Sequence, residues 1–180
     1  MLYEIIMAGF GGQGIMVMGQ LLAYAAMLEG KEVSWMPSYG PEMRGGTANC
    51  TVVVSSEKIG SPIVSNPTAS IVMNKPSFDK FEPVVKKHGI LVVNSSLVED
   101  KSQREDLEKI YIPANEIANK LGNSKVANMV TLGAYVGKTN IVSLNSLEES
   151  LKKVFSNKKK ELIPLNMEAL RKGMELANKA

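Results

Sequence analysis

The sequence predicts an α/β fold with three layers, in which helices cover both faces of a mostly parallel or mixed sheet. Short apolar runs alternate along the chain with segments of helical periodicity, which is the order of elements in α/β proteins. The runs at 71–73 and 90–93 are apolar at every position, and strands of that kind are buried on both faces. A strand, a glycine-rich loop and a helix open the chain, as in Rossmann-like domains. We expect a single domain over residues 1–180, because this length is enough to bury a hydrophobic core.

The individual elements follow from local patterns. Strands are expected where short apolar or alternating runs occur, at residues 2–8, 32–36, 48–55, 70–74, 90–94 and 109–112. Helices are expected where apolar residues recur every three or four positions, at residues 14–28, 77–87, 115–121, 125–138, 146–155 and 164–178. Pro83 predicts that the helix at 77–87 is short or kinked. The charged stretch 99–108 is expected to form a mobile surface segment.

The first candidate site is the glycine cluster that follows the first expected strand. Its members are Gly9, Gly11, Gly12, Gln13 and Gly14. The spacing matches G-x-G-x-x-G, in which glycines allow a tight turn and a helix N-terminus offers free N–H groups to an anion. An NAD site also needs an acidic residue about twenty positions later, at the end of the second strand. Glu29 and Glu32 stand before the second strand rather than at its end, so the cluster indicates either a plain α/β turn or a site for another phosphate-bearing group.

A second loop, between Ser38 and Thr47, combines an aromatic residue, a carboxylate and a guanidinium with glycines and a proline. The residues singled out are Tyr39, Gly40, Pro41, Glu42, Arg44, Gly45 and Gly46. Proline fixes its own φ angle and glycine adopts conformations closed to other residues, so this loop controls where Glu42 and Arg44 point. One interpretation is a turn whose two charges pair with each other, and the other is a binding surface. The presence of the glycine cluster favours the binding surface.

Taken together, the two loops resemble those of the gamma subunit of the 2-oxoacid:ferredoxin oxidoreductases that act on pyruvate, 2-oxoglutarate or 2-oxoisovalerate. Members of that family open with a strand and G-x-G-G-Q-G and then carry S-Y-G-P-E-x-R-G-G-T, and both motifs are intact here. Further matches lie at 59–62, 112–118, 128–133 and 166–170, so the resemblance covers nearly the whole chain. Segment 66–68 lacks the acidic residue expected there, which affects only a local contact. The residues before R-G-G separate the chain from the indolepyruvate branch.

The resemblance implies a role in a cytoplasmic, multi-subunit oxidoreductase. Such a complex decarboxylates a 2-oxoacid on thiamine diphosphate with magnesium, passes electrons through iron-sulfur clusters to ferredoxin, and forms an acyl-CoA. The chain length is compatible with a separate gamma subunit of the 2-oxoglutarate type. The implied partners are thiamine-bearing alpha and beta subunits and a ferredoxin-like subunit or domain, and a homo-oligomer of the isolated chain is left open. No catalytic residue and no cofactor is assigned to this chain, so we expect the isolated chain to be inactive.

The resemblance also gives the two loops their expected roles. The glycine cluster is expected near coenzyme A, because backbone N–H groups and a helix dipole favour a pyrophosphate. The loop at 39–46 and Asn128 are expected at the interface with the thiamine-bearing subunits or near the active site. Two loops that only form subunit interfaces are an alternative of equal weight. A different class of function, a stand-alone Rossmann-like nucleotide-binding protein, would need an acidic ribose ligand and a catalytic residue.

Composition argues against several other classes of function. The net charge of +3 is small, and most of the positive residues are lysines with few arginines among them, so no nucleic-acid partner is expected. Cys50 and His88 are the only residues of their types, which leaves no ligand set for zinc or an iron-sulfur cluster, and no metal site is expected. Cys50 lies in an apolar run, where a buried, inert thiol is expected. The longest apolar stretch, near 15–28, is interrupted, so neither membrane spanning nor secretion is expected.

Overall fold

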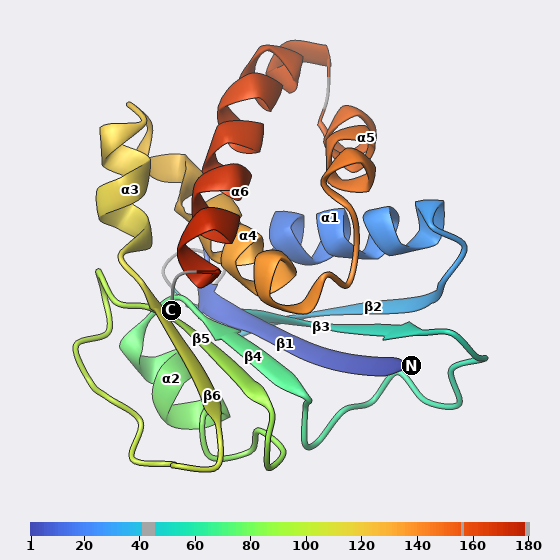
Figure 1. Cartoon of the computed structure of the whole chain (residues 1–180), viewed down its shortest axis with the longest axis vertical. Helices are drawn as coiled ribbons and strands as arrows, with labels where there is room; N and C mark the ends of the chain where they lie inside the picture. The colour runs from blue at the N-terminus through green and yellow to red at the C-terminus, as the bar shows by residue number, and fades with distance from the viewer. Residues whose placement is uncertain (41–45, 156, 179–180) are drawn as a thin grey trace.

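The computed structural model describes residues 1–40, 46–155 and 157–178, and within them a mixed sheet forms the centre of the fold (Figure 1). Its strands are β1 (Leu2–Phe10), β2 (Glu32–Tyr39), β3 (Thr47–Ser55), β4 (Ala69–Val72), β5 (Ile90–Asn94) and β6 (Glu108–Ile112). Their order in this part of the chain is β2-β3-β1-β4-β5-β6. Strands β1, β4, β5 and β6 are parallel, whereas β3 runs antiparallel to both β1 and β2. The predicted α/β class with a mixed sheet is confirmed.

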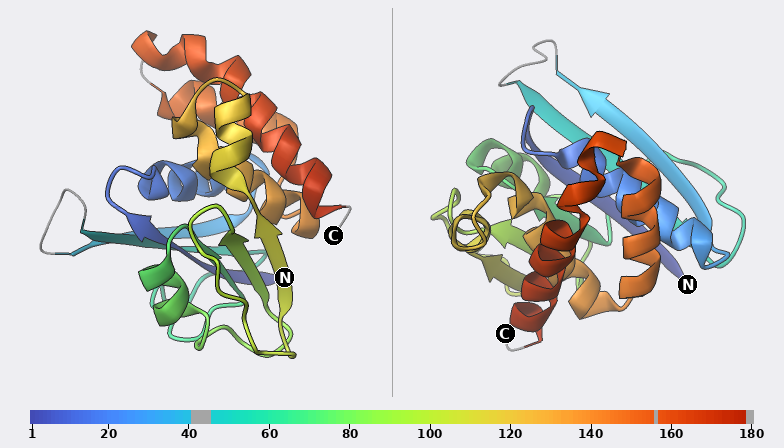
Figure 2. Two further views of the ribbon diagram at one scale, coloured as in Figure 1. Left: turned by 90° about the vertical axis from the view of Figure 1, so that its left-hand side faces the viewer. Right: turned by 90° about the horizontal axis from the view of Figure 1, so that it is seen from above.

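Helices cover the two faces of the sheet unequally. They are α1 (Ile15–Leu28), α2 (Lys75–Phe81), α3 (Ala114–Lys120), α4 (Ala127–Thr139), α5 (Leu144–Val154) and α6 (Ile163–Ala177), with the short 3₁₀ helices η1 (Ser124–Val126) and η2 (Asn157–Leu162). Figure 2 shows α1, α4, α5 and α6 on one face of the sheet, with α2 and loops on the other. Among the described residues, no helix is long and apolar enough to cross a lipid bilayer.

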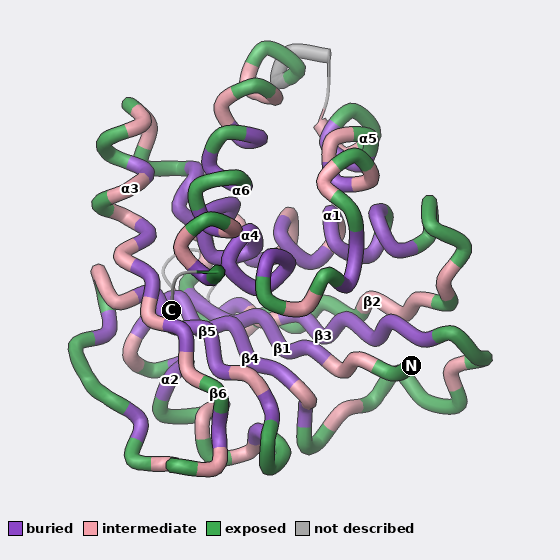
Figure 3. Tube along the Cα trace, viewed as in Figure 1, coloured by how far each residue is buried: buried purple, intermediate pink, exposed green. Residues whose placement is uncertain are grey.

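The alternation of side chains along β1 divides the core in two. Ile5 and Met7 are fully buried in a large cluster on the side of α1 and α4, whereas Ile6 and Ala8 pack with Phe78 of α2 on the other side. Figure 3 shows buried positions running along the central strands β1, β4 and β5. Because both faces of these strands are covered, their sequences are apolar at consecutive positions, which is the pattern that predicts the fold class.

β2 is an edge strand, and Pro37 interrupts the exposed edge. The N–H of Gly40 donates to the carbonyl oxygen of Thr47 at 2.8 Å, which marks these residues as a hydrogen-bonded pair that continues the β2–β3 ladder. Along an antiparallel ladder, hydrogen-bonded pairs alternate with pairs that are not hydrogen-bonded. Pro37 is three residues before Gly40, so it belongs to the second kind and directs its backbone groups away from β3. Proline has no N–H and is tolerated on edge strands at such positions. The exposed edge of β2 therefore cannot pair continuously with another strand.

The observed elements differ from the expected ones mainly at their ends. The helix expected at 77–87 is wrong in its bounds, because only Lys75–Phe81 is helical. Asn74 starts α2, since its side chain accepts a hydrogen bond from the N–H of Ser77 (2.9 Å), and Pro83 has no N–H with which to continue the helix. The strand expected at 70–74 ends earlier, at Val72, because the chain turns there into α2, which Asn74 caps. The strand expected at 32–36 extends to Tyr39.

The charged segment between β5 and β6 is anchored to the end of α2. Arg104 donates hydrogen bonds to the carbonyl oxygens of Glu82 (3.1 Å) and Val85 (2.7 Å), and its guanidinium pairs with Asp106 (2.6 Å). These contacts satisfy carbonyl groups that follow the last turn of α2. Mobility of the segment 99–108 stays a prediction.

α4 and α6 cross in close contact because glycines stand at the crossing. A Cβ atom on Gly173 of α6 would overlap the carbonyl oxygen of Val130 in α4, and one on Gly133 of α4 would overlap the carbonyl oxygen of Leu170. The two helix backbones therefore touch without intervening side chains.

Gly173→Ala is expected to destabilise the fold by about 1–3 kcal/mol, because the added methyl group forces two packed backbones apart. Gly60→Ala is the matched control, since no atom lies within 4 Å of the Cβ position there. Urea unfolding followed by circular dichroism measures both variants. Equal unfolding midpoints for Gly173→Ala and the wild type would contradict the close crossing.

Glu29 joins the end of α1 to the start of α5. Its carboxylate accepts hydrogen bonds from the N–H of Ser143 (2.6 Å), the hydroxyl of Ser146 (2.8 Å) and the ammonium of Lys31 (2.7 Å). Burial alone raises the pKa of Glu29, but the three donors outweigh it and lower the pKa from 4.5 to about 2.

Glu29→Gln is expected to lower the free energy of unfolding at neutral pH by about 1–3 kcal/mol. The folded pKa lies below the unfolded one, so the carboxylate's contribution is fully present above pH 4.5 and is lost as the pH falls through about 2. The stability difference between wild type and variant should therefore shrink over that range. Urea unfolding at a series of pH values measures it, and a difference independent of pH would contradict the assignment.

Candidate functional site

The glycine loop, residues 11–14, connects β1 to α1 by a turn that needs glycine at two positions. Gly12 has a φ angle of 97° and Gly14 one of 75°, both in the left-handed region that other residues adopt only with strain. Gln13 fastens the loop: its Oε1 accepts a hydrogen bond from the N–H of Phe10 (2.6 Å), and its Nε2 donates to the carbonyl oxygen of Met73 (3.4 Å). The loop is thus fixed to the ends of both β1 and β4.

The N-terminus of α1 presents hydrogen-bond donors at this loop. No described residue accepts a hydrogen bond from the N–H groups of Ile15, Met16 or Val17, and the N-cap residue Gly14 has no side chain to do so. The first turn of α1 contains no acidic residue. Together with the positive end of the helix dipole, these donors favour an anion.

Asn128 holds the glycine loop from the side of α4. Its Nδ2 donates to the carbonyl oxygen of Gly14 (3.1 Å), and its Oδ1 accepts a hydrogen bond from the N–H of Met129 (2.9 Å). Only 5% of Asn128 is exposed, and a Cβ atom on Gly14 would overlap its amide. The structure therefore places Asn128 against the glycine loop, whereas sequence reasoning grouped it with the second loop.

The second candidate loop begins and ends beside the glycine loop. Outside the described residues lie Pro41, Glu42, Arg44 and Gly45, whose placement stays a prediction. On the described flanks, Tyr39 ends β2 with 59% of its surface exposed. The carbonyl oxygen of Gly46 accepts a hydrogen bond from the N–H of Gly11 (2.9 Å). The structure thus brings a flank of the second loop into direct contact with the glycine loop.

Gly12 lines three separate hollows. One of about 250 Å³ lies beside Met16 and Tyr39, and one of about 170 Å³ lies beside Gln13 and Asn115. The third, of about 260 Å³, lies between α1 and α4. Lys125 lines the second and the third. Sequence reasoning missed this lysine, and the only signal for it is its position at the start of an expected helix.

This edge of the sheet is the one at which open α/β sheets bind ligands. The chain runs from β1 through α1 to β2, on one side of β1 in the sheet, and from β4 through α2 to β5, on the other side. The two connections therefore diverge at the carboxyl ends of the neighbouring strands β1 and β4. Ligands bind at such a switch point. β2, however, lies at the far edge and is separated from β1 by β3. β2 is thus not the neighbour of β1, unlike the second strand of NAD-binding Rossmann domains, and the prediction against NAD stays a prediction.

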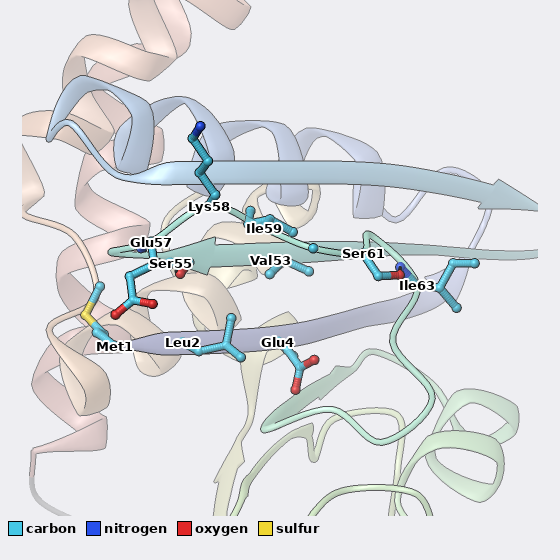
Figure 4. Close-up of a pocket in the computed structure, with 11 residues that line it drawn as sticks. Met1, Leu2, Glu4, Val53, Ser55, Glu57, Lys58, Ile59, Ser61 and Ile63 are labelled. Carbon is cyan, nitrogen blue, oxygen red and sulfur yellow. Dashed lines mark hydrogen bonds between the residues drawn. The ribbon is translucent and has the colours of Figure 1, made fainter.

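A separate hollow of about 340 Å³ lies at the other end of β1. Figure 4 shows Leu2 and Glu4 of β1 and Val53 of β3, with Ile59 and Ser61 on the loop that follows β3. No residue of the two motif loops lines this hollow. The candidate site is accordingly the carboxyl edge of the sheet.

The single cysteine is buried and lines none of the three hollows of the candidate site. Cys50 of β3 is fully buried, and its Sγ donates a hydrogen bond to the carbonyl oxygen of Ile15 (3.6 Å). Burial raises the pKa of the Cys50 thiol to about 12, which opposes thiolate chemistry. Within the described ranges, no group of three or more His, Cys, Asp or Glu side chains could hold a metal ion.

The sequence matches the family described as pyruvate ferredoxin/flavodoxin oxidoreductase over residues 4–176. It is 41% identical over 178 residues to the ketoisovalerate oxidoreductase subunit VorA of Methanothermobacter marburgensis, covering 98% of this chain and 37% of VorA. It is 38% identical over 177 residues to the 2-oxoglutarate synthase subunit KorC of Methanocaldococcus jannaschii, covering 97% of this chain and 93% of KorC. The chain thus spans little more than a third of VorA but nearly all of KorC.

Solved structures share this fold. The gamma subunit of a keto/oxoacid ferredoxin oxidoreductase from Geobacter sulfurreducens matches with a TM-score of 0.87 at 30% identity, over 100% of this chain and 98% of that one. A 2-oxoglutarate:ferredoxin oxidoreductase from Magnetococcus marinus, with 2-oxoglutarate, coenzyme A and succinyl-CoA bound, matches with a TM-score of 0.91 at 28% identity, over 99% of this chain and 31% of that one. The chain therefore belongs to the pyruvate ferredoxin/flavodoxin oxidoreductase family, as a gamma-type member.

Proposed function

We propose that the chain is the gamma subunit of a cytoplasmic complex that oxidatively decarboxylates 2-oxoglutarate, forms an acyl-CoA and passes electrons to ferredoxin. The 38% identity to KorC, against 31% to the common gamma subunit of the pyruvate and ketoisovalerate oxidoreductases of Pyrococcus furiosus, supports the 2-oxoglutarate type. The higher identity to VorA favours 2-oxoisovalerate as the second candidate substrate. The proposed partners are thiamine-bearing alpha and beta subunits and a ferredoxin-like subunit or domain.

Within that complex, we propose that the glycine loop binds the pyrophosphate of coenzyme A. The observation that carries this is the left-handed turn at Gly12 and Gly14, which aims the N-terminal donors of α1 at the carboxyl edge of the sheet. Coenzyme A contains a pyrophosphate and a 2-oxoacid does not, so coenzyme A is the substrate that these donors suit. Lys125 adds a positive charge on the same edge.

The redox cofactors are proposed to belong to the partners. Thiamine diphosphate would supply the decarboxylation chemistry and iron-sulfur clusters the electron path. Cys50 is buried with a raised pKa and so does not suit an iron ligand, and the family resemblance assigns thiamine diphosphate to the partners. This chain's own part is to bind and orient coenzyme A. The loop at 39–46, with Glu42 and Arg44, is proposed to contact the thiamine-bearing subunits.

The substrate assignment is tested with the purified chain and with the complex formed by co-expression with its partner subunits. We expect no 2-oxoacid-dependent dye reduction, thiamine or iron in the isolated chain, since the sequence predicts no ligand set for them. In the complex, kcat/KM for 2-oxoglutarate should exceed that for 2-oxoisovalerate and pyruvate by about tenfold or more. Turnover by the isolated chain, or a preference for 2-oxoisovalerate, would contradict this assignment.

The role of the loop is tested by Gly14→Ala, which strains a left-handed position and displaces Asn128. The KM for coenzyme A in the complex should rise by about tenfold or more, while the KM for the 2-oxoacid changes little. Gly30→Ala is the matched control, because Gly30 has a nearly equal φ of 73°, has no atom within 4 Å of its Cβ position, and lies beyond the other end of α1. Equal KM values for coenzyme A in the two variants would contradict binding at the loop and would indicate that the loop is only a structural turn.

A further inference from the structure

The two edges of the sheet differ in what they offer to another strand. β2 and β6 are the outermost strands of the described sheet. Pro37 interrupts the edge of β2, whereas β6, Glu108–Ile112, contains no proline. Figure 2 (left) looks onto the β6 side of the sheet, where α3 lies above the strand and no helix lies in front of it. β6 is therefore the edge at which the sheet can be extended.

Hydrogen bonding fixes which backbone groups of β6 point away from the sheet. The N–H of Glu108 donates to the carbonyl oxygen of Gly89 (2.9 Å), directly before β5, so Glu108 directs its backbone groups inward. Because this direction alternates along a strand, Ile110 also points toward β5, while Lys109 and Tyr111 point outward. No described residue hydrogen-bonds with the N–H or the carbonyl oxygen of Lys109 or Tyr111. These two residues thus present their donors and acceptors at an open edge.

A second copy of β6 is complementary to this edge. When an antiparallel copy is placed with Ile110 opposite its own equivalent, Lys109 of each copy stands opposite Tyr111 of the other. Each such pair exchanges both of its N–H···O bonds, so all the outward groups of both residues are satisfied. We propose that the chain forms a two-fold symmetric dimer in which β6 pairs antiparallel with β6 of a second copy and the two sheets become continuous.

The side chains of β6 suit the same pairing. Tyr111 packs against the core cluster on the side of α2, and Lys109 lies on the same face of the strand. A lysine on an edge strand usually opposes pairing, but here it comes opposite an aromatic ring of the second copy, which attracts an ammonium group. On the other face, the two Ile110 side chains meet at the symmetry axis. The net charge of +3 is small, so two copies repel each other little.

The blocked edge at β2 limits this assembly to two copies. A sheet with two open edges can add copies without end, whereas pairing of one edge with itself closes after two. β4 and β5 separate β6 from β1, so the dimer leaves the glycine loop uncovered by the strand contact. The dimer and the function proposed above are therefore independent, and either can fail without the other.

The experiment is sedimentation velocity of the purified full-length chain over a concentration series. A strand of five residues makes a small interface, so we expect a reversible dimer with a dissociation constant of about 10–100 μM. Amide hydrogen exchange measured by NMR at low and high concentration locates the interface. The N–H groups of Lys109 and Tyr111 should exchange more slowly at high concentration. The N–H of Trp35 is the internal control, because it points outward from β2, two residues before Pro37, and should exchange at the same rate at both concentrations.

A matched pair of variants separates the backbone from the side chain. Lys109→Pro removes an outward N–H at a position where an edge strand tolerates proline. Lys109→Ala lacks the same lysine side chain but keeps the N–H. The dissociation constant of the Lys109→Pro dimer should exceed that of the Lys109→Ala dimer by about tenfold or more, because the proline removes a hydrogen bond from each of the two symmetric pairs. Thermal unfolding checks that both variants are folded.

Three results would overturn the proposal. A chain that stays monomeric up to about 1 mM would show that the open edge does not pair. A dimer with equal dissociation constants for Lys109→Pro and Lys109→Ala, or with no slowed exchange at Lys109 and Tyr111, would form through another face. Assembly beyond two copies would contradict the closed pairing of β6 with itself.

Discussion

The left-handed turn at Gly12 and Gly14 is the constraint on which the arrangement of the site depends. It ends β1 and begins α1 within four residues, so the N-terminus of α1 lies at the carboxyl ends of β1 and β4. Three contacts fix the turn, through Gln13 to β4, through Asn128 to α4 and through Gly46 to the second loop. The same backbone geometry leaves the first N–H groups of α1 without acceptors among the described residues, and the proposed binding function follows from that.

The unequal layers give the two sides of the sheet different roles. The thick layer of α1, α4 and α6 borders one of the hollows beside the glycine loop, and its close helix crossing at Gly173 holds α6 against α4. On the far edge, Pro37 prevents β2 from adding a strand. The subunit contacts proposed at this edge would therefore use side chains and loops rather than extension of the sheet.

Local patterns predict the elements of this fold because each strand and most helices carry their own signal. Consecutive apolar residues predict buried strands, and Asn74 and Pro83 explain why one expected helix is shorter than its periodicity. The glycine loop is also visible in the sequence, because its spacing is local. The place of Lys125 beside the glycine loop is not, since it depends on how α1, α4 and the segment before α6 pack together, which no local pattern specifies.

The central claim is that the N-terminal amides of α1 form the anion site. Two-dimensional ¹H–¹⁵N NMR of the labelled chain during titration with pyrophosphate tests this most directly, because it observes each N–H group separately. The account predicts the largest shifts for Gly12, Gly14, Ile15, Met16 and Val17, with no shift for Gly30 beyond the other end of the same helix. Shifts absent from these amides, or centred instead on the hollow lined by Leu2, Val53 and Ile59, would contradict the account.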